Sequence, residues 1–479
     1  MASTSGPASG RRTGGRRSGD LSGGPAPDRR TRLLTLAVAA SVAVAFADSS
    51  VVVLALPDLY SAFRTSIVGV SWVITAYNLV VCAVAFSLAP LARKLHARPL
   101  VGAGLVLFVA GSVGCASSWS LVALVAFRCL QGLGGALLLA AALPILAGLA
   151  GDAARGTRAW ILAGTLGAAV GPALGGVLTQ LADWRAIFAF QAPVAASALV
   201  ATFDHRVRAL QRGGTPGSGA ARGSAAAGIA LALIFAALVG ALFLAVLLVI
   251  TVWQRQPATG ALIVSVLPLA AVCARRLAAG LDGRAEIAGG TLLLAAGLAS
   301  LALLPAVSDA LVVVSLALCG LGLGLSVPPL TRAAMGAAAA PLRSGAVSVG
   351  ARHLGLVVSL ALIAPLLSAA LDRAGERALL AGTRVIMDGN VDLVNKVPIA
   401  LQLRDEFLDT PTGEVPDLAK PFDERGARTD ARLRALRDRL LGTLRGSITR
   451  GFRSSFALSA LFALATVLPA ATFRRGEGA

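Results

Sequence analysis

One acidic residue lies deep inside the apolar part of this sequence. Asp48 lies past the middle of an apolar run over residues 33–57, and no other Asp or Glu occupies the interior of such a run. A carboxylate at bilayer depth costs about 2.5–3.5 kcal/mol on insertion scales, so one that is retained there has a function by default. We expect Asp48 to load and release a proton or to sense a cation. The alternative is an Asp that is hydrogen-bonded to its neighbours near one leaflet, without proton chemistry.

A lone cation is the second residue of this kind. Arg128 lies in an apolar run over 120–149, three residues before Gln131. The segment Ser118–Ser120 marks the start of that run, which places Arg128 about 12 Å inside it. A fixed positive charge near Asp48 would tune the proton affinity of that acid. The alternative is an arginine whose charged end reaches back to the membrane interface.

The composition is that of a membrane protein. The 479 residues are 56% hydrophobic and 14% charged, whereas about 25% of residues are charged in an average soluble protein. Apolar runs long enough to cross a hydrocarbon core of about 30 Å recur along most of the chain. The formal net charge of +19 does not indicate nucleic-acid binding, because much of the excess arginine lies in the tails and in short loops. We predict an all-α polytopic membrane protein.

Twelve apolar runs in two sets of six organise the chain. The loops on one side carry most of the Lys and Arg, which places both termini in the cytoplasm. Two halves around a central basic linker are typical of a secondary transporter. The predicted segments are a disordered basic tail over 1–31, a six-helix bundle over 32–203, a cytoplasmic linker over 204–227, helices seven to eleven over 228–371, an extracytoplasmic loop over 372–453, helix twelve over 454–473 and a cytoplasmic tail over 474–479.

The loop over 372–453 is long and polar, but it ends in an amphipathic pattern. Leucine or isoleucine recurs every three or four residues between Leu433 and Ile448, with arginines between them. This pattern predicts a basic amphipathic helix. Three placements stay open: on the outer membrane surface, over the outer mouth of the bundle, or as a lead into the final helix.

The sequence GTLGAAVGPALGG places small residues at four-residue spacing along one helix face. Such a stripe lets two transmembrane helices approach closely, and a bilayer tolerates the proline within it. The alternative is an ordinary tight helix contact. The stripe comprises Gly164, Gly167, Gly171, Pro172, Gly175 and Gly176.

Four segments together resemble one family. GPALGG resembles the antiporter motif of the major facilitator superfamily, and RCLQGLGGA, which begins at Arg128, is similar to the R-x-x-Q-G motif of its fourth helix. ADSSVVVLALPDL, which contains Asp48, is similar to the first-helix signature, and DWRAIFAFQAP to the start of the sixth helix. The resemblance is to the drug:proton antiporter branch, whose members usually have fourteen helices. Residues 204–226 are too polar to span a membrane, so we expect twelve.

The resemblance implies roles for further residues. Asp48 and Arg128 are each implied as proton-coupling residues. The segment WVITAYN matches a second-helix pattern of the family, and RHLG over 352–355 resembles its R-Q-L-G segment. For the second-helix residues, packing and an interfacial Trp belt are the alternative. The candidate residues of the substrate cavity are Trp72, Thr75, Tyr77, Asn78, Gln131, Phe190, Gln191 and His353.

The loop between the second and third helices departs from the family pattern. The family has G-x-L-x-D-R-x-G-R-R, whereas this chain has APLARKLHARP, with Arg93, Lys94 and Arg98 as its basic residues. Arg93 stands where the family has an Asp that helps to latch the two halves. Either this chain latches its halves differently, or it transports poorly, or it does something else.

We therefore expect a monomeric transporter in a bacterial plasma membrane that exports small hydrophobic or amphipathic compounds by alternating access. A proton gradient drives it, and no cofactor is expected. The scattered Cys and His residues do not form a metal-ligand pattern, and the glycine run over 320–324 lies in an apolar run rather than after a strand, which argues against an enzyme. Two alternatives stay open: an exporter of a specific metabolite, peptide or lipid, or a non-transporting membrane sensor that uses residues 372–453.

Overall fold

The chain folds into long helices. A computed structural model describes residues 28–205, 207, 225–305, 307–335, 341–388, 393–409 and 430–471, and all regular structure within these ranges is helical. Twelve of the described helices are long and apolar enough to cross a membrane. The protein is therefore a multi-pass membrane protein, as predicted. Most of the predicted tail over 1–31 and most of the linker over 204–227 lie outside the described residues.

The first half contains six spans. Hydroxyl or carboxylate side chains accept hydrogen bonds from free backbone N–H groups at several helix starts, for example Ser66 at α2 and Ser120 at α4. The elements are α1 (Arg29–Phe63), α2 (Ile67–Leu91), α3 (Ala97–Ala116), α4 (Leu121–Ala150), α5 (Ala153–Leu181) and α6 (Arg185–Ser197), which continues into the short α7 (Leu199–Phe203).

The second half repeats this count with two irregularities. Its first span begins as α9 and continues with wider, π-helical turns through η1 and η2, and its last span is a helix in three consecutive pieces. The elements are α9 (Ala225–Val239), η1 (Gly240–Leu244), η2 (Leu247–Val252), α10 (Pro257–Leu277), α11 (Gly283–Ala302), α12 (Asp309–Met335), α13 (Pro341–Asp388), α14 (Leu393–Asp409), α16 (Ala431–Gly451), α17 (Arg453–Ala465) and α18 (Val467–Ala471).

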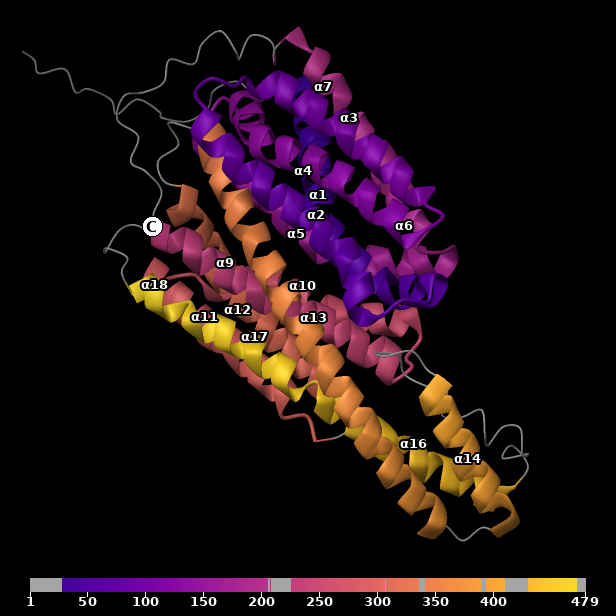
Figure 1. Cartoon of the computed structure of the whole chain (residues 1–479). Coiled ribbons are helices and arrows are strands. Elements are labelled where there is room, and N and C mark those ends of the chain that lie inside the picture. The colour runs from indigo at the N-terminus through magenta and orange to yellow at the C-terminus, as the bar shows by residue number, and fades with distance from the viewer. Residues whose placement is uncertain are drawn as a thin grey trace, which may run out of the picture.

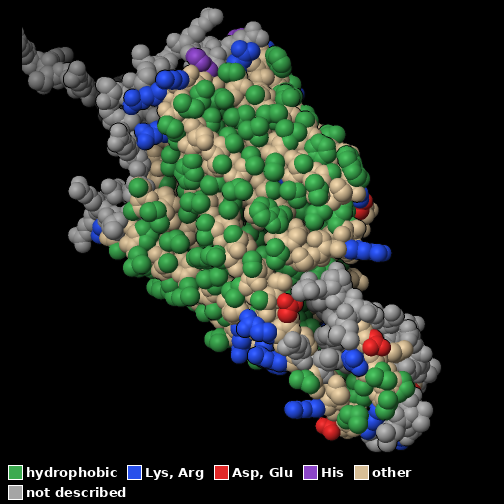
Figure 2. Space-filling view, viewed as in Figure 1, with side chains coloured by type: hydrophobic (Ala, Val, Ile, Leu, Met, Phe, Trp, Pro, Cys, Tyr) green, Lys and Arg blue, Asp and Glu red, His purple; other side chains and the backbone are tan. Residues whose placement is uncertain are grey.

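The two halves lie side by side (Figure 1). They meet where α2 packs on α13 and where α5 packs on α10. Hydrophobic side chains cover the body of the molecule, and the visible Lys and Arg side chains gather toward its two ends (Figure 2). This distribution fits a bilayer around the body, because lipid takes the place of a buried core for outward-facing Leu and Val.

The helix that contains the eleventh span does not end at the predicted boundary at residue 371. Helix α13 continues without a break to Asp388, a length of 48 residues. A helix of this length spans about 72 Å, more than twice a hydrocarbon core of about 30 Å. Its end therefore projects from the body together with α14 and α16 (Figure 1). We call residues 372–388, 393–409 and 430–451 the projecting bundle.

The amphipathic pattern near Leu433 does form a helix, α16. Its leucine face is buried inside the projecting bundle, against Ile386 of α13 and Ile399 of α14. An indole N–H of Trp253 donates to Thr449 Oγ1 over 3.0 Å and ties the end of α16 to the end of η2. The helix then leads into α17. Of the three placements, the lead into the final span is the one observed, and the membrane-surface placement is wrong because the apolar face is not free.

Candidate functional site

A buried ion pair lies in the middle of the first half. Arg128 of α4 donates from Nη1 to Asp48 Oδ1 of α1 over 2.8 Å, and its Nη2 lies 2.7 Å from Oδ2. Both side chains have an exposed fraction of 0%. The two residues are 80 positions apart in the chain. Their bidentate contact joins α1 to α4 without access to solvent.

The guanidinium of Arg128 has further partners. Its Nε donates to the carbonyl oxygen of Val73 over 2.8 Å, and Nη1 also donates to Gln131 Oε1 over 2.6 Å. The guanidinium carbon lies 4.3 Å from the ring centre of Tyr77 and 5.7 Å from that of Phe188. Stacking on aromatic rings stabilises a desolvated cation. Arg128 is therefore fixed in place even before its contact with Asp48 is counted.

Gln131 extends the contacts to two more helices. Its Nε2 donates to Ser112 Oγ of α3 over 2.9 Å and to Gln191 Oε1 of α6 over 2.7 Å. On the other side, Ser49 donates to Asn78 Oδ1 over 3.0 Å. We call Asp48, Arg128, Gln131, Ser112, Gln191 and their hydrogen-bond partners the pair network. It connects α1, α2, α3, α4 and α6 within one half.

The stability of the pair depends on whether Asp48 is ionised or protonated. A buried ion pair is tolerated because each charge neutralises the other, and removing one partner leaves an uncompensated charge that costs about 3–5 kcal/mol. Protonation of Asp48 removes its charge in the same way. Binding of a proton to Asp48 would therefore destabilise the observed arrangement of the pair network and favour another one.

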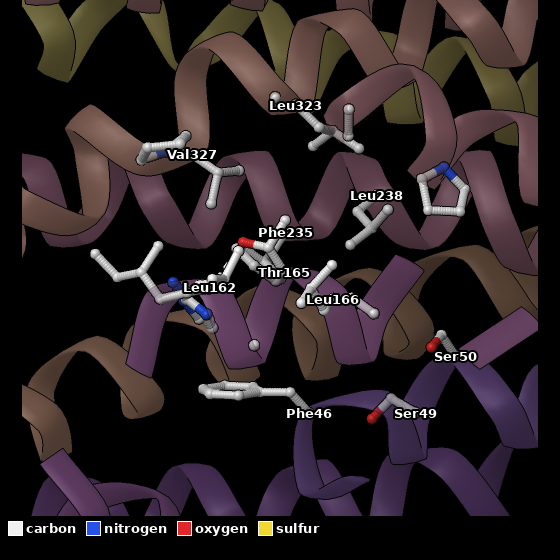
Figure 3. A pocket seen from close by; sticks show the side chains of 18 of the residues that line it. Phe46, Ser49, Ser50, Leu162, Thr165, Leu166, Phe235, Leu238, Leu323 and Val327 are labelled. Atoms are coloured by element: carbon white, nitrogen blue, oxygen red, sulfur yellow. Dashed lines mark hydrogen bonds between the residues drawn. The ribbon is translucent and has the colours of Figure 1, made fainter. Parts of the chain in front are cut away.

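A cavity of about 1130 Å³ lies between the two halves. Its wall is mostly apolar, and residues from α1, α5, α9 and α12 converge on it (Figure 3). Ser49 and Ser50 line the cavity, whereas the neighbouring Asp48 does not. The wall also extends to Thr157 and Arg158 near the start of α5. The cavity thus reaches the helix that carries Asp48 but not the carboxylate itself.

Most predicted cavity residues lie elsewhere. His353 lines this cavity, while Trp72 and Phe190 are exposed, at 48% and 38%, and Gln131 and Gln191 belong to the pair network. On the second helix, Thr75, Tyr77 and Asn78 are buried and do not line this cavity. Tyr77 instead donates its hydroxyl to the carbonyl of Ala45 over 3.0 Å.

Three arginines reach the cavity: Arg158, Arg332 and Arg352. The sequence analysis gave neither Arg158 nor Arg332 a role in the site, and it included Arg352 only through the RHLG segment. Arg352 is 5% exposed, and its Nη2 donates to Thr331 Oγ1 over 2.9 Å. Nδ1 of the neighbouring His353 lies 2.8 Å from the carbonyl oxygen of Val349, which accepts a hydrogen bond when Nδ1 carries the ring proton.

The glycine stripe packs mainly within the first half, and one of its glycines faces the second half. A Cβ at Gly167 would collide with the carbonyl oxygen of Ala43, and one at Gly175 would lie 2.7 Å from that of Val51, so both glycines face α1. Gly164 and Gly171 also face α1. Gly176 alone of the stripe faces α10, at Ala261. Pro172 lies inside α5, which continues through it to Leu181.

Arg98 lies in the first turn of α3, directly after the basic loop that follows α2. It donates from Nε to the carbonyl of Thr202 over 2.5 Å, which ties the start of α3 to α7 in the same half. Arg93 and Lys94 are exposed and make no ion pair with any described residue. Among the described residues, no group of three His, Cys, Asp or Glu side chains could hold a metal ion.

Known proteins resemble this chain in sequence and in fold. It is 34% identical to the methylenomycin A resistance protein of Bacillus subtilis over 33% of this chain and 34% of that protein. It is 33% identical to the drug efflux pump JefA of Mycobacterium tuberculosis over 35% of this chain and 34% of the pump. The matches therefore span about a third of the length of these curated relatives.

Among solved structures, a bacterial homologue of the lysosomal transporter Spinster has a TM-score of 0.59 at 14% identity, over 92% of this chain and 98% of that one. The D-xylose–proton symporter has a TM-score of 0.54 at 15% identity, over 69% and 89%. Likenesses at this identity establish the fold. The sequence profile of the Major Facilitator Superfamily matches residues 38–362, well over half of the chain. The chain belongs to the Major Facilitator Superfamily of transporters and is not an enzyme.

Proposed function

We propose that this transporter exports small hydrophobic or amphipathic compounds in exchange for protons, and that Asp48 carries the proton. The observation that carries the proposal is the fully buried pair of Asp48 and Arg128 beside a large apolar cavity. The relatives named as a resistance protein and a drug efflux pump support export as its direction. We further propose a monomer in a bacterial plasma membrane with both termini in the cytoplasm.

The proposed cycle follows from the charges. When Asp48 takes a proton, Arg128 loses its counter-ion and the contact between α1 and α4 weakens. Ser49 and Ser50 of the same helix line the cavity, so a shift of α1 reaches the substrate directly. Release of the proton to the other side restores the pair. Each state of the pair thus favours one arrangement of the helices, as alternating access requires.

The test uses inverted membrane vesicles with an acid interior. A panel of cationic, anionic and neutral amphipathic dyes and antibiotics is added, and the collapse of the pH gradient is measured. We expect collapse with the wild type and none with Asp48→Asn. Asp58→Asn is the matched control, because Asp58 lies on the same helix but outside the pair network, and it should behave as wild type. Collapse that persists in Asp48→Asn would refute the role of Asp48.

A further inference from the structure

The charged groups on the cavity wall have one sign. The described residues that line it include Arg158, Arg332 and Arg352, and no Asp or Glu. His353 is the remaining titratable side chain among the described residues of the wall. Low-dielectric walls with charges of one sign focus the field and concentrate ligands of the opposite sign. The wall therefore discriminates against cations, although many efflux substrates are cationic compounds.

Arg352 differs from an ordinary buried arginine because it has no counter-ion among the described residues. It is 5% exposed, makes no ion pair with any described residue, and its Nε has no hydrogen-bond partner. Buried arginines are normally paired with an acid. Arg128 of this protein, which is also buried, is paired with Asp48. Arg352 thus keeps an unused donor and an uncompensated charge at the cavity wall.

Aromatic rings take the place of a protein counter-ion. The guanidinium carbon of Arg352 lies 5.0, 5.3 and 5.2 Å from the ring centres of Phe46, Trp160 and Phe235. Such contacts stabilise a cation by about 0.5–2 kcal/mol each. They cover the faces of the guanidinium and not its edge, where Nη2 donates to Thr331 and Nε has no partner. In-plane N–H donors of a guanidinium match the geometry of a carboxylate, sulfonate or phosphate.

The rest of the wall suits an apolar body. Leu162, Leu166, Leu238, Leu323 and Val327 surround the same space (Figure 3). The cavity volume of about 1130 Å³ slightly exceeds that of typical ligand pockets, which is about 300–1000 Å³. There is room for a compound with several rings or a long chain next to the arginine.

From these contacts we infer that the cavity binds amphipathic anions: compounds with an apolar body and a carboxylate, sulfonate or phosphate group that pairs with Arg352. The inference rests on the proposed function, because it names the substrate class of the same cavity. It also connects substrate to proton. Phe46, which stacks on Arg352, precedes Asp48 by two residues and so lies about 200° around α1 from it. An anion at Arg352 and a proton at Asp48 act on the two faces of one helix.

The test is equilibrium binding to the purified full-length protein in detergent, without a proton gradient. The probes are pyrenebutyrate, its neutral amide and pyrenebutyl-trimethylammonium, which share one apolar body and differ in charge. We expect the anion to bind at least about tenfold more tightly than the cation, and Arg352→Gln to weaken the anion about tenfold while leaving the amide unchanged. Arg352→Lys should retain part of the anion preference.

The matched control is Arg373→Gln, on the same helix but exposed and outside the cavity. It should bind all three probes as wild type does. A wild type that prefers the cation overturns the inference, and so does an Arg352→Gln protein with an unchanged anion preference. The wild-type comparison decides the matter even if Arg352→Gln does not fold. Since no proton moves in this experiment, its outcome is independent of whether Asp48 couples transport.

Discussion

At the scale of single residues, the two partners of the buried pair are held unequally, because Arg128 has contacts that would persist if it separated from Asp48. Arg128 keeps the carbonyl of Val73, Gln131 and the face of Tyr77 when Asp48 is neutral. The carboxylate of Asp48 has no comparable set of fixed partners among the described residues, where its hydrogen bond and ion pair are both to Arg128. We infer that Arg128 stays in place and that Asp48 and α1 move when a proton binds.

The pair also makes a prediction about stability. Asp48→Asn leaves a buried positive charge, so we expect it to lower the free energy of unfolding by about 3–5 kcal/mol. The double variant Asp48→Asn with Arg128→Gln removes both charges and should recover most of that loss. Thermal unfolding in detergent measures both. A double variant that is less stable than Asp48→Asn would contradict the account of the pair.

The sequence predicted these two residues but not their contact. Each stands out alone, because an ionised group in an apolar run is expensive. Their contact depends on the way α1 packs on α4, which no local pattern encodes. The sequence did not reveal the role of Arg352 for a related reason. Its role depends on its surroundings in the fold, where no acid pairs with it and the rings of Phe46, Trp160 and Phe235 come from three different helices.

At the scale of elements, the glycine stripe of α5 packs closely against α1, and we call this contact the seam. Gly167 touches the backbone at Ala43, and Gly171 lies against Ser50, which lines the cavity. The spacing predicted close packing but not the partner helix.

The end of α13 was missed because hydropathy falls after residue 371 while Ala, Leu, Arg and Glu remain, and these residues favour a helix in water as well.

A larger side chain at the seam should separate α1 from α5. We expect Gly167→Val to lower the free energy of unfolding by about 1–3 kcal/mol or more, as overpacking does, and to reduce transport. The control is Gly289→Val in α11, where an added Cβ meets nothing within 4 Å. Thermal unfolding and the vesicle assay compare the two. Equal stability of the two variants would show that the seam is not tight.

At the scale of the whole molecule, the orientation in the membrane remains a proposal from the Lys and Arg distribution. If it is right, the projecting bundle lies outside the cell and the loop before α5 lies inside. Single cysteines at Arg439 and Arg155, both exposed, report on the two sides. Cys129 and Cys273 are replaced by alanine, since the other three cysteines are buried.

We expect an impermeant maleimide added to intact cells to label Arg439→Cys and to spare Arg155→Cys until the cells are opened. Labelling in the reverse pattern would invert the topology and with it the direction of transport.

The twelve spans were predictable because each is an uninterrupted apolar run. The projecting bundle was not, because its core of Ile386, Ile399 and Leu440 assembles from three helices that are separate in the sequence.

The central claim is that Asp48 couples transport to protons in addition to stabilising the fold through its buried pair with Arg128. The most direct measurement compares two modes in proteoliposomes, with the compound that collapses the pH gradient most strongly in vesicles. One mode is accumulation driven by a pH gradient, and the other is exchange of labelled for unlabelled compound without a gradient. We predict that Asp48→Asn loses driven accumulation and keeps exchange. Driven accumulation at the wild-type level in Asp48→Asn would contradict the account.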